Sequence, residues 1–257
     1  MFATGNLAVS SGTVFWSYID SWGSNPTGPV MAMPERGGTP TTLATGQQLS
    51  DMGSGMAANA TAVYWNLDYC NGECIYSPTG PQGAVMWAPA RGGTGGTIAM
   101  DPGSFSGVGL DDASVYWANS LQGTVAKAPV AGGAETTLAT GQSSPSFLTT
   151  DSSNAYWINL GNPPATSEIV TVPVGGGTPV TLASNQSYPR GLAADGASVY
   201  WVTFDGAIMK VPKSGGTLVM LASGQDTGNS TTNVITVDAT SVYWVTGDGS
   251  IMKLTPK

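Results

Sequence analysis

The sequence predicts an all-β fold, a six-bladed β-propeller, on three observations. An aromatic residue followed by Trp recurs six times, with 40 to 52 residues between successive repeat tryptophans. Each recurrence lies in a segment with the pattern of four short strands, and this period matches a four-stranded propeller blade. The composition agrees, because 36 glycines among 257 residues and a charged fraction of 9% are typical of a turn-rich β protein.

Each repeat contains the same elements in the same order. A first strand ends at a polar residue six positions before the Trp, and the second strand holds the aromatic pair. The third strand ends at a proline in five repeats, because proline has no N–H for the ladder, and a Gly-Gly turn then leads into the fourth. The unit is clearest at 191–224, GLAADGASVYWVTFDGAIMKVPKSGGTLVMLASG. The six aromatic pairs are Phe15-Trp16, Tyr64-Trp65, Tyr116-Trp117, Tyr156-Trp157, Tyr200-Trp201 and Tyr243-Trp244.

The strand count predicts how the ring closes. After Ile251–Leu254 the sixth repeat has no fourth strand left, whereas Met1–Gly5 aligns with the fourth strands of other repeats. We therefore expect the N-terminal strand Met1–Gly5 to pair in the last blade, which keeps the sheet edges short and shielded. A single domain then spans residues 1–257.

Two recurring polar residues have structural interpretations. An aspartate before a bend predicts hydrogen bonds to the turn backbone, and it recurs as Asp111, Asp151, Asp195 and Asp238. A glutamine at the end of a fourth strand favours hydrogen bonds between blades over lining the pore, and it recurs as Gln47, Gln142, Gln186 and Gln225.

Charge and composition exclude several kinds of partner. The net charge is −8 and only eight Lys and Arg are present, which argues against nucleic acid and against an anionic membrane surface. No apolar run of about 18 residues is present, so we expect no membrane insertion. Without histidine there is no Ser-His-Asp or Cys-His arrangement and no His-ligated metal. We expect a monomer with no cofactor and no metal.

The two cysteines bear on the compartment. Cys70 and Cys74 lie four positions apart in the segment CNGEC. Zinc requires four nitrogen or sulfur ligands, so a disulfide is the favoured interpretation and indicates an oxidising environment. The chain begins MFATG, without the charged and apolar regions of a secretory leader. We expect a secreted, periplasmic or cell-surface protein whose leader was removed or trimmed.

The candidate ligand site lies on the face where the connections between second and third strands meet those between blades. Long loops on a rigid scaffold concentrate binding groups. Arg190 is the cation expected on this face, and Tyr188, Trp22, Tyr69 and Tyr76 are expected around it. One hypothesis is an aromatic pocket in which a guanidinium anchors an anion. The other is that Arg190 pairs structurally with a neighbouring carboxylate.

The Tyr-Trp repeats resemble the YWTD propellers of low-density lipoprotein receptors and, more closely, bacterial secreted proteins with VYW, Gly-Gly and LASGQ repeats. The Thr-Asp that follows Tyr-Trp in YWTD repeats is not kept here. The resemblance implies a receptor-ligand role, so we expect a non-enzymatic module that binds a glycan, peptide or protein. The alternatives are a structural or surface-layer propeller, and a hydrolase or lyase in which Asp20 and Asp68 act as acid and base.

Overall fold

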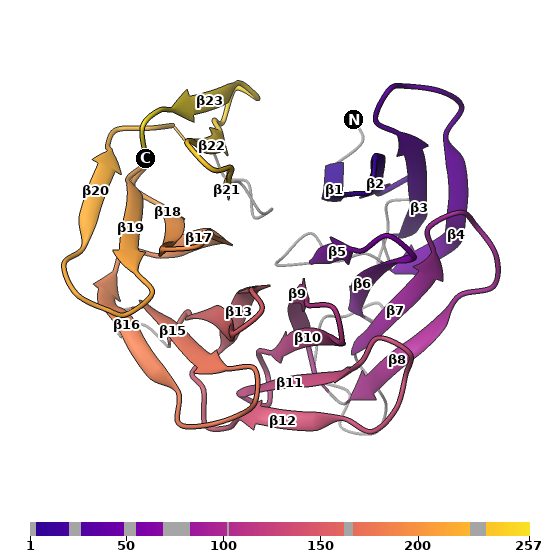
Figure 1. Cartoon of the computed structure of the whole chain (residues 1–257), viewed down its shortest axis with the longest axis horizontal. Coiled ribbons are helices and arrows are strands. Elements are labelled where there is room, and N and C mark those ends of the chain that lie inside the picture. The colour runs from indigo at the N-terminus through magenta and orange to yellow at the C-terminus, as the bar shows by residue number, and fades with distance from the viewer. Residues whose placement is uncertain are drawn as a thin grey trace.

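The computed structural model describes residues 4–20, 27–48, 55–68, 83–101, 103–161, 167–226 and 235–257, and the regular elements in these ranges are all β-strands. The strands form six antiparallel sheets arranged around a common centre (Figure 1). The predicted all-β, six-bladed propeller is confirmed. Within the same ranges, no helix has the length and hydropathy needed to cross a membrane.

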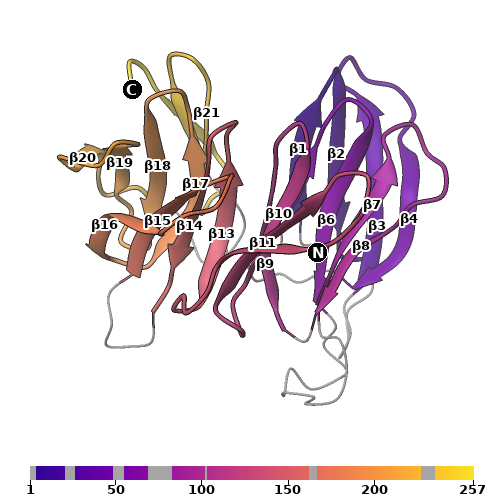
Figure 2. The same ribbon diagram turned by 60° about the horizontal axis from the view of Figure 1, so that its bottom comes forward.

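Each sheet corresponds to one repeat, and its strands follow chain order from the centre outward (Figures 1 and 2). The first three sheets contain β1 (Thr4–Ser10), β2 (Thr13–Tyr18), β3 (Thr27–Pro34) and β4 (Thr41–Gln48); β5 (Met56–Ala58), β6 (Ala62–Asp68), β7 (Gly83–Pro89) and β8 (Gly96–Asp101); β9 (Phe105–Leu110), β10 (Ser114–Asn119), β11 (Thr124–Pro129) and β12 (Thr136–Ala139). The last three contain β13 (Pro145–Thr150), β14 (Asn154–Asn159), β15 (Ser167–Pro173) and β16 (Val180–Gln186); β17 (Pro189–Ala194), β18 (Ser198–Thr203), β19 (Ile208–Pro212) and β20 (Val219–Ala222); β21 (Ile235–Val237), β22 (Val242–Val245) and β23 (Ile251–Leu254).

The hydrophobic core lies between the sheets. Successive side chains of a strand point to opposite faces, so the aromatic pair of each second strand serves two interfaces. Tyr200 packs in one buried cluster with Trp244 of the sixth sheet. Its neighbour Trp201 packs in another cluster with Tyr156 of the fourth sheet. The same alternation builds five interfaces, which explains why the repeat carries two large aromatic residues in succession.

Three of the four recurring glutamines bond across these interfaces, as predicted, whereas Gln225 Nε2 donates to Ser223 O of its own sheet and the buried Trp244 Nε1 has no hydrogen-bond partner among the described residues. Trp201 Nε1 donates to Gln186 Oε1 of the preceding sheet at 3.2 Å, and Trp65 Nε1 donates to Gln47 Oε1 at 3.3 Å. In the fourth sheet the bond comes from Asn159 Nδ2, which donates to Gln142 Oε1 of the third sheet at 3.0 Å. These bonds satisfy polar atoms that the packed interface would otherwise bury without partners.

The predicted pairing of Met1–Gly5 in the last blade falls only partly on described residues. Met1–Ala3 lie outside the described residues, and the sixth sheet has three described strands. Thr4 pairs with Tyr18 of β2 and so belongs to the first sheet, which contradicts that part of the Met1–Gly5 prediction. The reason is a register shift between Thr4 and Leu7, which lets the chain continue along β2 beyond the regular part of β1. Pairing of Met1–Ala3 in the last blade stays a prediction.

Candidate functional site

The loop-rich rim is the face on which the connections between second and third strands meet those between blades. The same backbone hydrogen bonds recur there in successive sheets. In the fifth sheet, Phe204 N–H donates to the carbonyl oxygens of Ser187 and Tyr188, both at 3.1 Å. These bonds join the turn before β17 to the turn after β18. The corresponding pairs, Ser120 N to Ser104 O at 2.9 Å and Leu160 N to Ser144 O at 3.2 Å, occur in the third and fourth sheets. The third, fourth and fifth sheets therefore share this rim backbone, although the residue that donates the bond differs among them.

Tyr188 occupies a backbone position that does not favour a tyrosine. Its φ of 41° lies in the left-handed region, where a side chain is disfavoured by about 1 kcal/mol. Ser144 takes the same conformation in the fourth sheet, with φ of 53°. The Tyr188 side chain is 55% exposed, so little packing compensates for this strain. The turn itself is a requirement of the repeat, whereas the aromatic ring is not.

Arg190 and Phe204 are in direct contact on the same rim. Arg190 lies opposite Val202 on the neighbouring strand β18. Its guanidinium carbon is 4.6 Å from the centroid of the Phe204 ring, which is cation–π geometry. Phe204 is 52% exposed despite this contact. Arg190 also has an interaction beyond the one with Phe204. The guanidinium is therefore held at the rim by its neighbours.

Comparison of the repeats shows that Tyr188, Arg190 and Phe204 differ from the residues at the same positions in the neighbouring sheets. Strand register places Arg190 where the third and fourth sheets have Ser106 and Ser146, opposite Ala118 and Ile158. Both serines are buried. The three positions are Ser104, Ser106 and Ser120 in the third sheet, Ser144, Ser146 and Leu160 in the fourth, and Tyr188, Arg190 and Phe204 in the fifth. We call Tyr188, Arg190 and Phe204 the rim cluster.

The structure thus brings two predicted residues together and adds a third. Arg190 and Tyr188 lie on the same rim, as the sequence predicts. Phe204 is a residue that the sequence analysis did not single out, because it lies in the short connection between the second and third strands of its repeat. The signal that could have found it is a Phe where neighbouring repeats place Ser120 and Leu160. The remaining predicted aromatic residues and the cysteine pair, Trp22, Tyr69, Tyr76, Cys70 and Cys74, lie outside the described residues.

The two candidate acid–base residues lie at the ends of equivalent second strands of neighbouring sheets, Asp20 just after its strand and Asp68 as the last residue of its own. Asp20 follows β2, its side chain is exposed, and its N–H donates to Thr27 O at 3.0 Å. Asp68 is the last residue of β6, and its side chain lies outside what the structure describes. Within the described ranges, no three His, Cys, Asp or Glu side chains gather closely enough to hold a metal ion.

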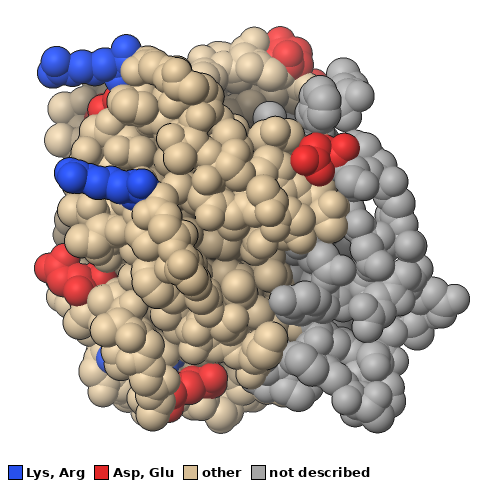
Figure 3. Space-filling view, turned by 90° about the vertical axis from the view of Figure 1, so that its right-hand side faces the viewer, with Lys and Arg blue, Asp and Glu red and all other residues tan. Residues whose placement is uncertain are grey.

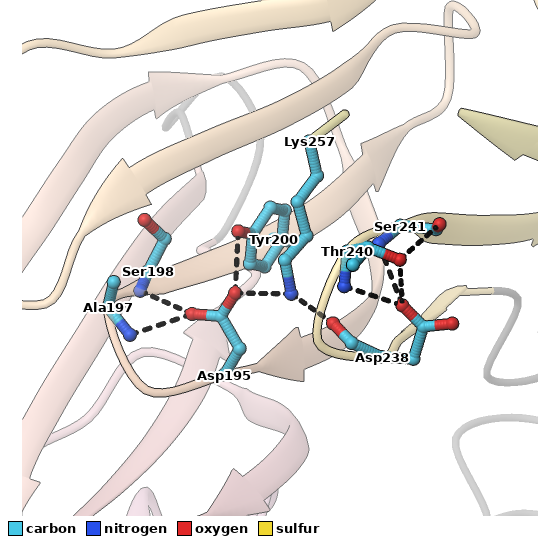
Figure 4. Close-up of polar contacts among 8 residues, drawn as sticks. All are labelled: Asp195, Ala197, Ser198, Tyr200, Asp238, Thr240, Ser241 and Lys257. Carbon is cyan, nitrogen blue, oxygen red and sulfur yellow. Dashed lines mark hydrogen bonds and ion pairs between the residues drawn. The ribbon is translucent and has the colours of Figure 1, made fainter. Parts of the chain in front are cut away.

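The recurring aspartates accept hydrogen bonds from the turn backbone, as predicted. Asp195 Oδ1 accepts the N–H groups of Ala197 and Ser198, and its Oδ2 accepts the Tyr200 hydroxyl at 2.8 Å (Figure 4). Lys257 Nζ lies 2.5 Å from the same Oδ2 and also donates to the carbonyl oxygen of Asp238 in the sixth sheet. The aspartate therefore closes its own turn and joins two blades.

These contacts set the charge state of the pair. Burial alone would raise the pKa of Asp195, but hydrogen bonds from Lys257 and the turn N–H groups outweigh it and hold that pKa well below its usual range. Burial, together with the bond to Asp195, raises the pKa of Tyr200 to about 12. Asp195 is thus ionised and fully engaged near neutral pH, which suits a structural role and not that of a catalytic acid.

Most cations lie away from the rim cluster. Arg36 and Arg91 stand in the turns after β3 and β7, and Lys213 Nζ pairs with Asp151 at 2.5 Å. In the side view the visible Lys and Arg side chains lie toward one edge of the molecule (Figure 3). All eight Lys and Arg of the sequence fall within the described ranges, and Arg190 is the one on this rim.

Comparisons with known proteins support the architecture. No protein-family model matches the chain, and no curated protein matches it in sequence. Among solved structures, a chain of a nidogen–laminin complex is similar at 19% identity and a TM-score of 0.65, covering 90% of this chain and 88% of that one. Streptogramin B lyase is similar at 15% identity and a TM-score of 0.65, covering 99% and 93%. TolB from Acinetobacter baumannii is similar at 10% identity and a TM-score of 0.59, covering 83% of this chain and 52% of its own.

At these identities the likeness establishes the fold alone. It confirms the predicted resemblance to six-bladed propellers. A propeller scaffold carries both binding proteins and enzymes, so function must be argued from the residues of the rim.

Proposed function

We propose that the protein is a non-enzymatic binding module that holds a glycan, peptide or protein partner against the rim cluster. The observation that carries this proposal is the departure of the fifth sheet from its neighbours. Tyr188 and Phe204 are exposed aromatic side chains on a backbone that other sheets build with Ser or Leu. Side chains that the fold does not require, placed on a rigid rim, are candidates for recognition.

The chemistry of the cluster suits a ligand with an anionic group beside an apolar one. The Arg190 guanidinium is stacked on Phe204, and its planar N–H edge has the geometry to donate to a carboxylate or similar group of a ligand. Tyr188 and Phe204 supply rings that bind with little loss of conformational entropy. Trp22, Tyr69 and Tyr76 belong to the same proposal as residues that extend the surface, and Cys70 and Cys74 as a disulfide that stiffens it.

The wider setting is part of the proposal. We infer a single domain over residues 1–257 that acts as a monomer in a secreted, periplasmic or cell-surface location. The support is the low charge, the glycine-rich repeats and the CNGEC segment. The alternative, a hydrolase or lyase, would depend on Asp20 and Asp68 and not on the rim cluster.

The test is a binding screen on glycan and peptide arrays with the wild-type protein and three variants. Arg190→Ala and Phe204→Ser should each weaken binding of any hit about tenfold or more, which corresponds to about 1.4 kcal/mol. Leu121→Ser is the matched control, because Leu121 is an exposed apolar residue in the turn after β10 and should leave binding unchanged. Equal binding by the wild type and both cluster variants would reject the proposal.

A further inference from the structure

The face opposite the rim is electrically neutral. It holds the turns between first and second strands, the turns after third strands, and the third-strand lysines that lie opposite the repeat tyrosines. Seven acidic and seven basic residues fall at these positions. The acidic residues are Glu35, Asp111, Asp112, Glu135, Asp151, Asp195 and Asp238, and the basic residues are Arg36, Arg91, Lys127, Lys210, Lys213, Lys253 and Lys257.

The rim, in contrast, carries most of the net charge of the protein. Arg190 is its one basic residue. The acidic residues at the rim ends of the described strands and in the described rim turns are Asp20, Asp68, Asp101, Glu168, Asp205, Asp226 and Asp248. The described part of the rim therefore accounts for six of the eight excess negative charges of the chain. A field of one sign over one face attracts a partner of the opposite sign and raises its rate of association.

The rim cluster lies where the fifth and sixth sheets meet. Directly opposite residues of paired strands share a face of the sheet, so Arg190 lies on the same face as Val202. Val202 packs in one buried cluster with Trp244 of the sixth sheet. The guanidinium and the Phe204 ring beneath it are therefore on the wall of the fifth sheet that faces the sixth.

Three exposed carboxylates belong to the same part of the rim. Asp205 directly follows the phenylalanine of the rim cluster, and Asp226 begins the connection to the sixth sheet. Gly247 N–H donates to Asp226 O at 2.6 Å, which joins this connection to the turn that contains Asp248. A hydrogen bond from the Thr246 hydroxyl holds the pKa of Asp248 below its usual range, so this carboxylate is ionised near neutral pH.

A buried donor in the same interface has no partner among the described residues. The Trp244 side chain is 4% exposed, and its Nε1 lacks a hydrogen bond. In the two preceding sheets the indole N–H points toward the rim, because Trp157 donates to Asn159 Oδ1 and Trp201 to Gln186 Oε1, both at the rim ends of strands. By the same geometry the Trp244 N–H points toward the rim end of its interface. A ligand atom can supply the acceptor that this donor lacks.

We propose that the rim of the fifth and sixth sheets binds a basic polypeptide segment, an inference that rests on the proposed binding function and names its class of ligand. Lysine or arginine side chains of the segment lie against Asp205, Asp226 and Asp248. Its apolar side chains cover the rings of the rim cluster, and one carboxylate of the segment meets the guanidinium. A backbone carbonyl oxygen accepts the Trp244 N–H when the rim end of the interface opens.

The charge of the rim selects among the ligands that the rim cluster alone admits. An acidic glycan offers an anionic group to Arg190, but the excess negative charge around that residue repels the rest of the molecule. A neutral glycan offers no cation to the three carboxylates. A basic segment is attracted by the whole face and still brings an apolar side chain and a carboxylate to the cluster. Salt screens such attraction, so the affinity depends on ionic strength.

Two peptides with free carboxyl termini, KKKKF and EEEEF, separate charge from the other contacts. In calorimetric titrations at low salt, KKKKF should bind the wild-type protein about tenfold or more tightly than EEEEF does. Its affinity should fall about tenfold between about 0.01 M and about 1 M NaCl, because the Debye length falls from about 30 Å to about 3 Å. Equal affinities for the two peptides, or an affinity for KKKKF that salt does not change, would overturn the proposal.

A pair of triple variants locates the charge that matters. Both variants remove three exposed carboxylates, one set from the rim and one from the opposite face. The rim variant is Asp205→Asn, Asp226→Asn and Asp248→Asn, and the control is Glu35→Gln, Asp112→Asn and Glu135→Gln. The rim variant should weaken KKKKF about tenfold, and the control should change its affinity less than about threefold. Equal losses in the two variants would reject docking on the rim.

Trp244→Phe tests the unpartnered donor, with Trp201→Phe as the matched control. Both variants lose the same ring volume at equivalent positions, but Trp201→Phe also loses the bond to Gln186. Trp201→Phe should therefore lower the Tm by about 2 °C or more beyond Trp244→Phe. Trp244→Phe should weaken KKKKF about threefold or more. Equal losses of Tm, or unchanged affinity in Trp244→Phe, would overturn the assignment of this donor to the ligand.

The same titrations distinguish failure of this inference from failure of the proposed function. If EEEEF binds and Arg190→Ala and Phe204→Ser abolish its binding, the rim cluster is a binding site and the basic class of ligand is rejected. If neither peptide binds in a way that depends on the rim cluster, both proposals are rejected for polypeptide ligands.

Discussion

Replacing Lys257 with Met isolates the charge that joins the fifth and sixth blades. The Lys257 ammonium lies 2.5 Å from Asp195 Oδ2, donates to the Asp238 carbonyl, and stands 5.4 Å from the Tyr200 ring centroid. Methionine keeps the apolar stem and removes the charge and its hydrogen bonds. The variant therefore changes the electrostatics of the junction more than its packing.

The expected loss follows from the burial of the pair. The Lys257 side chain is 9% exposed and that of Asp195 is 18% exposed, so the pair is neither a surface pair nor a fully buried one. Exposed pairs contribute up to about 1 kcal/mol, and removing one partner of a buried pair costs about 3–5 kcal/mol. Asp195 keeps its bonds from Tyr200 and two N–H groups, so we expect a loss of about 2 kcal/mol. For a chain of this length that is a fall of about 4–8 °C in Tm.

Differential scanning calorimetry of the wild type, Lys257→Met, Asp195→Asn and the double variant measures this coupling. The sum of the two single losses should exceed the loss in the double variant, because each single change removes the same interaction. Lys210→Met removes a cation from the neighbouring strand β19 and should change the Tm by less than about 1 °C. A Lys257→Met variant as stable as Lys210→Met would refute the account of the junction.

Two further predictions concern the scaffold. A Cβ on Gly107, at φ of 77°, would lie 2.3 Å from Leu148 N, so Gly107→Ala should cost about 3 kcal/mol or more in urea unfolding; Gly224→Ala, at φ of 65° with open space around it, should cost about 1 kcal/mol. The pKa values of Asp151 and Asp195 are held below the unfolded value of about 3.9 despite burial, so their stabilisation is present above that pH and is lost as the pH falls further. The Tm measured by differential scanning calorimetry should therefore fall between pH 5 and pH 2, and it should fall by less in Asp195→Asn than in the wild type. A Tm that does not change with pH would contradict the role given to these carboxylates.

The blades could be predicted from sequence because their determinants are local and repeated. The aromatic-Trp pair recurs in all six repeats, and the aspartate before the bend and the terminal glutamine each recur at one register in four of them. A residue that recurs at one register has a structural reason to do so. The predicted bonds of Asp195 and Gln186 are both present for this reason. Because the strand pattern repeats, the blades can be recognised without any knowledge of contacts between residues far apart in the sequence.

The end of the ring was harder to predict, because β pairing of a short strand has little sequence specificity. The segment at Met1–Gly5 resembles a fourth strand, yet Thr4 pairs along β2 through a register shift. Which neighbour such a segment takes depends on the geometry of two blades at once. That information is not contained in the segment itself.

Part of the candidate site could be predicted because its residues do not repeat and therefore stand out from the other blades. Arg190 and Tyr188 were found because charge and position single them out. Phe204 was missed because a turn pattern says which residues form the bend and not which side chain stacks on a neighbour across it. The contact between Arg190 and Phe204 depends on two turns brought together by backbone bonds from separate strands.

The central claim is that the side chains of the rim cluster are not required for folding and serve to bind a ligand. The most direct measurement is the Tm of the triple variant Tyr188→Ser, Arg190→Ser and Phe204→Ser, which gives the fifth sheet the residues of the third. The account predicts a Tm within about 2 °C of the wild type together with loss of array binding. A fall of more than about 6 °C would show that these side chains hold the rim together, and it would contradict the claim.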